Sequence, residues 1–299
     1  MKRHLIFSAV ALLAGQPLLA DVVSAATDTP SPKTETASAI KSVHSITIRN
    51  VVIGEGAPKI AVPTTGSTAA QVLDQARQVG SNKDADIIEY RIDYLDFAYD
   101  ANEVAKLGKQ VAEAVHGKPV ILTFRTGAEG GPKPIKDEDY GNLYSALIEA
   151  GFADLLDVEM FRDEKVVKRL VDEAHKAGVK VIMSNHDFHK TPPTEEMVSR
   201  LRRQQELGAD VLKIAVMPHD PGDVLKLEDA TWQMRSRYTD RPLMTMSMAS
   251  PGVISRLSGE VFGQSITVGK IGQASAPGQV DVKELRAVLD TIHESVQGN

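Results

Sequence analysis

Residues 179–216 read VKVIMSNHDFHKTPPTEEMVSRLRRQQELGADVLKIAV, and this stretch contains the pattern that decides the fold. The short apolar runs Val179–Asn185 and Val211–Val216 are typical of buried strands, and Thr194–Glu206 between them has the periodicity of an amphipathic helix. A strand, a helix and a second strand in this order form a βαβ unit, in which the two strands are parallel. The stretch therefore predicts an α/β fold.

The same pattern continues in both directions along the chain. Further strands are expected at 60–64, 87–93, 120–125, 155–159, 243–248 and 265–268, and further helices at 67–79, 102–114, 137–150, 164–177, 220–237, 252–257 and 282–296. Eight βα units match a closed (β/α)8 TIM barrel and leave Ser45–Val52 as an extra N-terminal strand. An open, doubly wound sheet is the alternative, but no GxGxxG motif follows the first strand.

Composition narrows the class of protein. The chain has 299 residues, of which 42% are hydrophobic and 25% charged, as in ordinary globular proteins. The formal net charge of -6 offers no basic excess to hold a phosphate backbone, so nucleic acid is not expected as a partner. Because there is no cysteine, thiol nucleophiles, disulfides, zinc–thiolate sites and iron–sulfur clusters are excluded.

The N-terminal residues 1–25 have the pattern of a secretory signal peptide. Lys2 and Arg3 are basic, and Leu5–Ala14 is an apolar run too short to cross the ~30 Å of a bilayer core. Val23-Ser24-Ala25 then offers a small-residue cleavage site. We therefore expect an exported, periplasmic protein with no membrane attachment after cleavage. The alternatives are a cytosolic chain with a mis-assigned start and an uncleaved anchor.

Residues 26–45 follow the signal sequence and are rich in Thr, Ser and Pro. This composition predicts a flexible tether, because it offers few large apolar side chains to bury. Residues 46–299 are then expected to form the catalytic barrel.

Charged residues interrupt the strand expected at Ile87–Asp93. Glu89, Arg91 and Asp93 alternate with apolar residues and so share one face of the strand. In a barrel strand, successive side chains point alternately to the interior and to the helix layer. Because the apolar face must pack on helices, the charged face is predicted to point into the barrel. A structural ion network is the alternative to a functional site, since buried charges are costly unless paired.

Lysine and histidine stand out on the two strands of the opening stretch. Lys213 is a lone lysine within an apolar run, where desolvation favours the neutral amine that can attack a ketone. An ion pair with the acids of the strand 87–93 is the alternative. His186 falls at a strand end, the usual place for a catalytic group in a barrel. Asp187 and His189 beside it also fit a metal site, but the early HxH of metal-binding barrels is missing.

Other polar residues follow the ends of neighbouring strands. Arg125 ends one strand and precedes Glu129 on a glycine-rich loop, Arg256 lies on the short helix after the seventh strand, and residues 273–279 form a small-residue loop. An inward lysine, a strand-end histidine, two arginines and a loop carboxylate suit one chemistry. The amine condenses with a ketone of an anionic substrate, and a nearby base removes the adjacent proton.

Several short sequence motifs, in a specific order and spacing, show a resemblance to a known family. From about Ser45 to His293 the chain resembles type I 3-dehydroquinate dehydratases. The words that carry this resemblance are Glu89-Tyr90-Arg91-Ile92-Asp93, Thr123-Phe124-Arg125, Glu129-Gly130-Gly131, Ser184-Asn185-His186-Asp187-Phe188-His189-Lys190-Thr191-Pro192, Lys213-Ile214-Ala215-Val216-Met217-Pro218, Gly252-Val253-Ile254-Ser255-Arg256 and Ala274-Ser275-Ala276-Pro277-Gly278-Gln279.

The resemblance implies a role for each matching residue. Lys213 would form a Schiff base with the ketone of 3-dehydroquinate, and His186, oriented by Glu129, would remove the adjacent proton and then protonate the departing hydroxyl. The residues implied in substrate binding are Glu89, Arg91 and Arg125 around the ring hydroxyls and the lysine, Arg256, Ser275 and Gln279 around the carboxylate, and Met246 and Met248 on the pocket wall.

The resemblance also implies a wider context. The barrel would be closed at the bottom by an N-terminal hairpin, would need no metal or organic cofactor, and would form a homodimer. Family members that serve aromatic amino acid biosynthesis in the shikimate pathway are cytosolic, so the predicted signal peptide favours quinate degradation outside the cytosol. Another Schiff-base lyase or aldolase acting on a sugar acid, and a binding protein without turnover, remain alternatives.

Overall fold

The computed structural model describes residues 42–298, so the predicted signal peptide and most of the predicted tether lie outside the described residues. Its main sheet contains nine strands, of which eight parallel strands form the barrel in the order β10, β3, β4, β5, β6, β7, β8, β9, and the short ninth strand pairs with β10. Their bounds are β3 (Lys59–Pro63), β4 (Ile87–Arg91), β5 (Val120–Thr123), β6 (Leu155–Glu159), β7 (Lys180–Asp187), β8 (Val211–Val216), β9 (Leu243–Ser247) and β10 (Ile266–Lys270). Ser265 N donates to Leu243 O over 2.8 Å and joins the starts of the two end strands. The predicted TIM barrel is confirmed.

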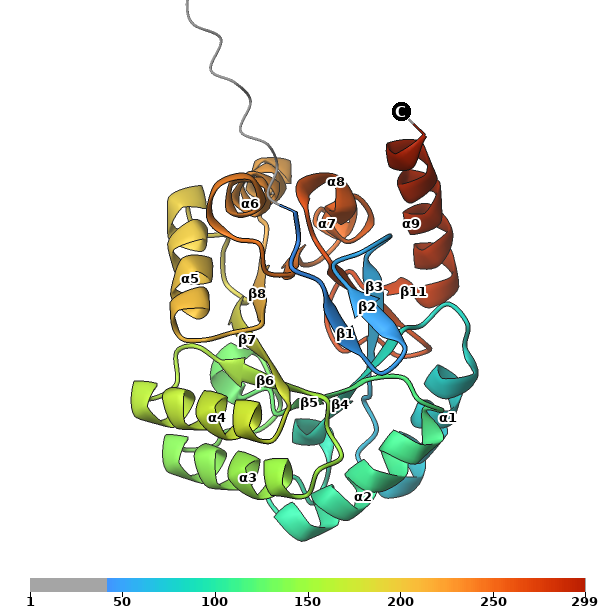
Figure 1. Cartoon of the computed structure of the whole chain (residues 1–299), viewed down its shortest axis with the longest axis vertical. Coiled ribbons are helices and arrows are strands. Elements are labelled where there is room, and N and C mark those ends of the chain that lie inside the picture. The colour runs from blue at the N-terminus through green and yellow to red at the C-terminus, as the bar shows by residue number, and fades with distance from the viewer. Residues whose placement is uncertain (1–41, 299) are drawn as a thin grey trace, which may run out of the picture. The chain divides into compact units, whose positions relative to one another are not determined.

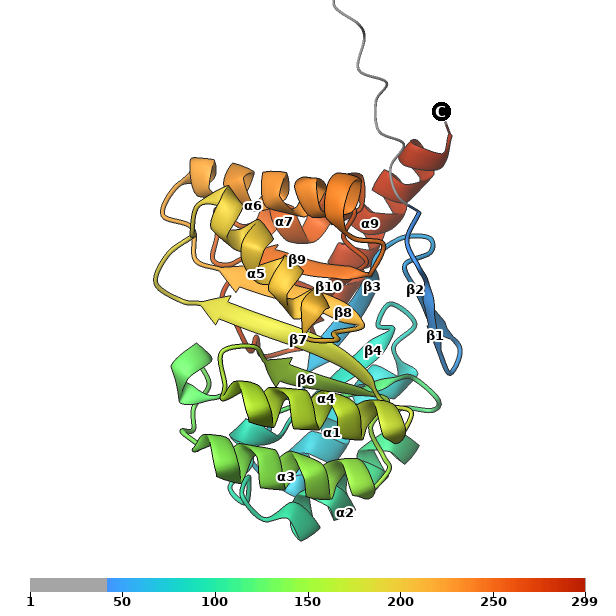
Figure 2. The same ribbon diagram turned by 60° about the vertical axis from the view of Figure 1, so that its left-hand side comes forward.

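Helices surround the strands, as Figures 1 and 2 show. They are α1 (Ala69–Ser81), α2 (Ala101–Ala114), α3 (Asp137–Glu149), α4 (Glu164–Lys176), α5 (Thr194–Glu206), α6 (Pro221–Gln233), α7 (Val253–Leu257), α8 (Gly259–Phe262) and α9 (Val282–Gln297), with short helical turns η1 (Ile92–Tyr94), η2 (Gly127–Glu129) and η3 (Met234–Tyr238). Side chains of Asp100, Asp163 and Asp220 accept backbone N–H groups at the starts of α2, α4 and α6. These caps satisfy donors that have no partner within the helix.

The alternation of side chains along each strand produces two separate cores. On β8, Leu212, Ile214 and Val216 belong to the core between strands and helices, whereas Val211 and Ala215 belong to the barrel interior. Each such aliphatic side chain stabilises the fold by about 1.5–3 kcal/mol when fully buried. The residues near the strand starts fill the interior with aliphatic groups, and the charged residues lie nearer the strand ends.

A hairpin covers the end of the barrel where the strands begin. Strands β1 (Ile46–Ile48) and β2 (Val51–Ile53) pair antiparallel, and both pack against the interior core. The prediction of one strand over Ser45–Val52 is wrong, because the chain reverses after Ile48 with Arg49 at a φ of 53°. The implied hairpin at the bottom is present, and in Figure 1 it lies across the middle of the ring of strands.

Several boundaries differ from those expected. The helix expected over 220–237 is α-helical only to Gln233 and continues as a π-helical turn, in which Thr239 N donates to Met234 O over 2.9 Å. The helix expected over 252–257 is followed at once by α8, and a two-residue strand β11 (Val280–Asp281) pairs with β10.

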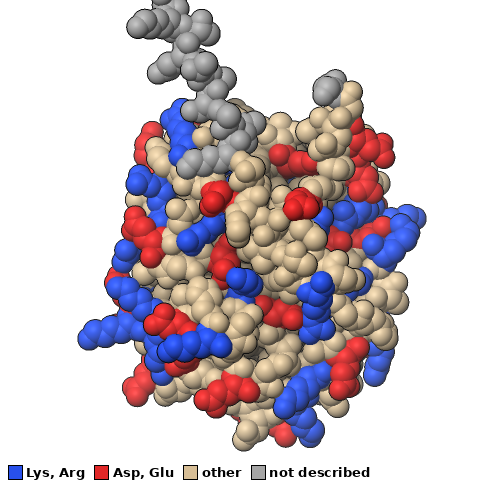
Figure 3. Space-filling view, in the orientation of Figure 1, with Lys and Arg blue, Asp and Glu red and all other residues tan. Residues whose placement is uncertain are grey.

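Two properties concern the surface and the helices. The face drawn in Figure 3 carries basic and acidic side chains interspersed rather than gathered by sign. Among residues 42–298, no helix is both long enough and apolar enough to cross a membrane.

Candidate active site

One cavity at the carboxyl ends of the strands brings together every residue that the sequence analysis assigned to the site. It is lined by Glu89, Arg91, Arg125, Glu129, His186, Lys213, Met246, Met248, Arg256, Ser275 and Gln279, and also by Gly130, Phe188, Ala215, Val268 and Ala276. These residues come from β4, the end of β5, η2, β7, β8, β9, α7, β10 and the loop after β10. Strand ends are where barrel enzymes place their reacting groups.

Lys213 lies on the inward face of β8 and is 3% exposed. Its Nζ donates to Asp157 Oδ2 over 2.7 Å and lies 3.7 Å from Glu89 Oε1. Gln204 fixes the same position through the backbone, accepting from Lys213 N and donating to Lys213 O over 2.9 Å and 2.8 Å. Two carboxylates therefore hold the amine in place, and only its neutral form can attack a ketone.

Arg125 joins most of the acids in the cavity. Its guanidinium lies 2.8 Å from Asp157, 3.0 Å from Glu159 and 3.5 Å from Glu129, and it donates to Ser184 Oγ over 3.0 Å. Burial lowers the pKa of Arg125, but the surrounding carboxylates outweigh burial and raise it well above its ordinary value. The arginine therefore keeps its charge and fixes the acids around it.

Glu129 and His186 form a hydrogen-bonded pair. Glu129 Oε2 accepts the backbone N–H of His186 over 3.0 Å and lies 2.9 Å from Nδ1 of the same residue. Burial first, and then Arg125 and Lys213, lower the pKa of His186 well below its ordinary value, so the ring is neutral at neutral pH. With Nδ1–H donated to the carboxylate, Nε2 is the ring nitrogen that can accept a proton.

The carboxyl of this pair also has a shifted pKa. Burial and then Glu159 raise the pKa of Glu129 to about 8, and Arg125 and Asn185 oppose the rise. The ionised carboxylate accepts the two N–H groups of His186 more strongly than the protonated carboxyl does. The proton-accepting form of the pair therefore grows as pH rises toward and past this value.

Arg256 contrasts with the other cations of the site. It is 1% exposed, and its Nη atoms reach only Val268 O at 3.4 Å, Pro277 O at 3.3 Å and Met246 Sδ at 3.6 Å. Its Nε has no hydrogen-bond partner and no carboxylate lies within ion-pair distance among the described residues. Burial alone lowers its pKa to about 10, which leaves it cationic at neutral pH. An anionic group in the cavity would complete this site.

The loop after β10 is held by its own side chains. Gln279 Oε1 accepts from Ser275 N, and Gln279 Nε2 donates to Ser275 Oγ, each over 2.9 Å. Tyr94 Oη donates to Ser275 O over 3.4 Å and ties the loop to η1. The two residues thus present a serine hydroxyl and an amide at the rim of the cavity.

Two acids in the centre of the site were not predicted. Asp157 and Glu159 lie on the inward face of β6 and are 0% and 1% exposed. Their sequence signal, acids alternating with apolar residues in Leu155-Leu156-Asp157-Val158-Glu159, is the same one that identified Glu89 and Arg91. Applying the rule of alternation to every strand would have found them.

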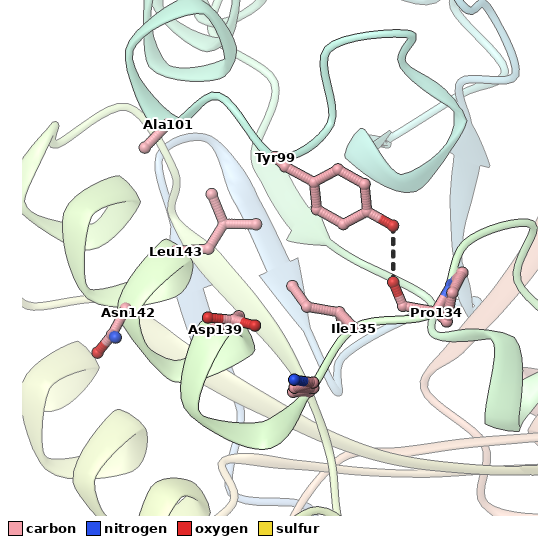
Figure 4. Close-up of a pocket in the computed structure, with 8 residues that line it drawn as sticks. Tyr99, Ala101, Pro134, Ile135, Asp139, Asn142 and Leu143 are labelled. Carbon is pink, nitrogen blue, oxygen red and sulfur yellow. Dashed lines mark hydrogen bonds between the residues drawn. The ribbon is translucent and has the colours of Figure 1, made fainter.

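A larger hollow lies apart from the charged cavity described above. Its volume is 740 Å³ against 40 Å³ for the cavity described above, and it is lined by Tyr99, Ala101, Pro134, Ile135, Lys136, Asp139, Asn142 and Leu143 (Figure 4). Tyr99 Oη donates to Pro134 O over 2.6 Å across it. It contains none of the predicted site residues, so the smaller, charged cavity is the candidate active site. Within residues 42–298, no group of three or more His, Asp or Glu side chains is placed to hold a metal ion.

Comparisons with known proteins agree on one family. A family model described as type I 3-dehydroquinase matches residues 60–296. The 3-dehydroquinate dehydratase of Bacillus licheniformis is 47% identical over 251 residues, 84% of this chain and 98% of that protein. The Salmonella typhimurium 3-dehydroquinate dehydratase is 47% identical over 253 residues, 85% of this chain and 100% of that protein.

Solved structures give the same result. The type I 3-dehydroquinate dehydratase of Clostridium difficile, crystallised with covalently modified comenic acid, is 45% identical with a TM-score of 0.82 and covers 85% of this chain and 99% of that one. The 3-dehydroquinate dehydratase of Geobacillus kaustophilus is 32% identical with a TM-score of 0.82, covering 87% and 100%. A 3-hexulose-6-phosphate synthase, at 21% identity and a TM-score of 0.54, shares the fold alone.

Proposed function

This chain belongs to the type I 3-dehydroquinase family, and from that premise we propose that its cavity binds 3-dehydroquinate and removes water from it to give 3-dehydroshikimate. The enzyme is then a carbon–oxygen lyase that works through a Schiff base on Lys213. The observation that carries the proposal is the pairing, in one cavity, of a buried lysine with the buried Arg256, which has no anionic partner among residues 42–298. The substrate supplies what both lack, a ketone for the amine and a carboxylate for the guanidinium.

The first step is formation of the Schiff base. The neutral amine of Lys213 adds to the ketone carbon, and loss of the ketone oxygen as water gives a protonated imine. Despite its burial, Arg125 and Lys213 hold the pKa of Asp157 well below its usual range, so this carboxylate stays ionised. Asp157 therefore orients the amine and stabilises the cationic imine. The proton that leaves the lysine before attack is returned to the former ketone oxygen, which departs as water, so no net proton is released.

The second step is the elimination itself. The imine withdraws electrons from the neighbouring carbon, and His186 Nε2 removes a proton from that carbon to give an enamine. The electron pair of the enamine then expels the hydroxyl on the next carbon, which leaves as water with the proton from the imidazolium. Because one histidine serves both transfers from one side, the proposed loss of water is syn. Hydrolysis of the conjugated imine releases the product and restores Lys213.

The test follows the reaction and its intermediate together. Purified protein should convert 3-dehydroquinate into 3-dehydroshikimate, and borohydride added with the substrate should inactivate it irreversibly. Mass spectrometry should locate the adduct on the peptide that contains Lys213, and borohydride alone should do little. An adduct on Lys190 would refute the proposed mechanism. Retro-aldol products would instead indicate another Schiff-base lyase, and unchanged substrate would indicate a binding protein.

We further propose that the protein is exported and acts in quinate degradation. The support is the sequence of residues 1–25, in which Lys2 and Arg3 precede an apolar run and Val23-Ser24-Ala25 offers a cleavage site; its removal would change the formal net charge from -6 to -7. N-terminal sequencing from the native host should begin at Ala26, or at Asp21 if cleavage follows Ala20. A full-length N-terminus in the cytosolic fraction would disprove export. Deletion of residues 1–40 should leave activity intact.

We also propose that the enzyme is a homodimer, on the basis of its family alone. Light scattering at micromolar concentration should give about twice the mass of one chain. A monomer under those conditions would reject the dimer and leave the catalytic proposal unaffected.

A further inference from the structure

The carboxylate of Glu129, which pairs with His186, is contacted from both faces of strand β7. Glu129 is contacted by two consecutive residues of β7, which point to opposite faces of the strand. His186, on the inner face, contacts Glu129 Oε2 through its ring Nδ1. The side chain of Asn185, on the outer face, donates from Nδ2 to Glu129 Oε1 over 3.3 Å. Asn185 is 4% exposed, although its face of the strand otherwise packs on helices. Each oxygen of the carboxylate is thus assigned to a different partner.

Arg200 on α5 holds Asn185 in this orientation. Its Nη1 donates to Asn185 Oδ1 over 2.8 Å, which leaves the amide nitrogen facing Glu129. Its Nη2 is paired with Glu196 one turn earlier on the same helix, and its Cζ lies 5.5 Å from the centroid of the Phe161 ring. The guanidinium is therefore fixed on three sides, and it is only 16% exposed. A continuous chain of contacts runs from α5 through β7 to the catalytic carboxylate.

We propose that Asn185 and Arg200 are positioning residues for the dehydration, which fix the catalytic carboxylate so that it accepts the imidazole N–H and leaves Nε2 free as the base. This inference rests on the function proposed above. Neither residue lines the substrate cavity, so neither is expected to contact the substrate. Their effect should appear in proton transfer and not in substrate binding.

The direction of the pH effect follows from the groups that face Glu129. Arg125 faces it from the end of β5, Asp157 and Glu159 from β6, and His186 from β7, with Asn185 on its outer side. The two acids of β6 raise the pKa of Glu129, whereas Arg125 and the amide of Asn185 lower it. Loss of the amide should therefore raise this pKa further. The proton-accepting form of the pair would then require a higher pH.

The test compares Asn185→Leu and Arg200→Met with the control Arg203→Gln. Arg203 lies on the same helix, and its ion pairs with Glu164 and Glu206 are exposed at the surface. For Asn185→Leu we expect kcat to fall about 10- to 100-fold with KM changed less than about twofold, and the acidic limb of the kcat profile to move to higher pH. Arg200→Met should show the same shift, smaller in size. The control should match the parent protein.

A second measurement avoids turnover. Titration of the His186 imidazole by NMR in the substrate-free enzyme should differ between Asn185→Leu and the parent, and should be unaltered in Arg203→Gln. If both variants keep the parent's pH profile and imidazole titration, or if KM rises in proportion to the loss in kcat, the positioning role is wrong. If the parent itself fails to convert 3-dehydroquinate, the proposed function fails instead, and the imidazole titration still tests whether Asn185 controls the pair.

Discussion

Arg125 and Arg256 occupy two sides of one cavity, and they are buried to the same degree, at 3% and 1% exposure. Arg125 has three carboxylates within 4 Å, whereas Arg256 has none among the described residues. Taking a charge out of water is costly unless a partner compensates it. The first arginine therefore belongs to a network that is complete without substrate, and the second holds a charge that only a ligand can neutralise.

A third buried arginine shows that burial by itself is not the signal. Arg235 is 2% exposed, and its guanidinium donates to the carbonyl oxygens of Thr239, Arg241 and Gly263. It lies outside the cavity, and its contacts join the segment between α6 and β9 to Gly263, which follows α8. What distinguishes Arg256 is the combination of an unpartnered donor and a place on the cavity wall.

The largest expected effect comes from removing Lys213, the proposed nucleophile, from the charged network around Arg125. Lys213→Met keeps the apolar packing of β8 and removes the amine, so turnover should fall by more than about 10⁴-fold. Borohydride should no longer trap substrate on the protein. Circular dichroism should show a folded variant, because Arg125 and Ser184 still donate to Asp157 Oδ1, although Oδ2 loses its contact with Lys213. Dehydration near the parent rate would exclude covalent catalysis by this lysine.

The next effect tests the catalytic pair. His186→Ala removes the group that moves the proton, and kcat should fall by about 10²–10⁴-fold, toward the upper end because the ring serves two transfers. Imine formation does not need this ring, so borohydride trapping on Lys213 should persist. An active variant would mean that another base, such as Glu89, removes the proton.

Replacing each of the two arginines by methionine tests the comparison directly. Arg125→Met leaves three buried carboxylates short of their partner and should lower the free energy of unfolding by about 3–5 kcal/mol. Arg256→Met should leave this free energy equal or raise it, while kcat/KM for 3-dehydroquinate falls about 10²–10³-fold through loss of the carboxylate contact. Urea unfolding and steady-state kinetics measure the two quantities. A strong loss of stability in Arg256→Met would contradict the claim that the charge of Arg256 is uncompensated without substrate.

The smallest effect concerns Glu228, a buried acid with no cationic partner in the part of the chain that the structure describes, just as Arg256 has no anionic partner there. Glu228 on α6 is 6% exposed, its partner is Ser258 Oγ at 3.4 Å, and burial raises its pKa to about 7 from 4.5. Its protonated form favours folding, so that contribution is complete below pH 4.5 and is lost as pH rises through about 7. Glu228→Gln should therefore match the parent at low pH and be more stable at pH 8, by about 2–3 kcal/mol. Thermal unfolding at both pH values measures this, with the exposed Glu149→Gln as control.

The positions of the strands and the inward residues were predictable because the signal is local. Alternation with a period of two in 87–93 and 211–216 placed Glu89, Arg91 and Lys213 on the inner face without any knowledge of their neighbours. The hairpin was not predicted as two strands, because Ser45–Val52 reverses at a non-glycine residue and carries no glycine or proline at the turn. Asp157 and Glu159 carry the same local signal in residues 155–159, so their inward position was equally predictable.

The sequence by itself determined the barrel, the family and the candidate reacting side chains, because each depends on local periodicity or on short sequence motifs. Only the tertiary structure decided which charges are compensated. Asp157 meets Arg125 and Lys213 across sequence separations of 32 and 56 residues, and Asn185 reaches Glu129 across 56. Electrostatic energies depend on distances and burial that exist only once the barrel has closed. The difference between Arg125 and Arg256 therefore cannot be read from their sequence context.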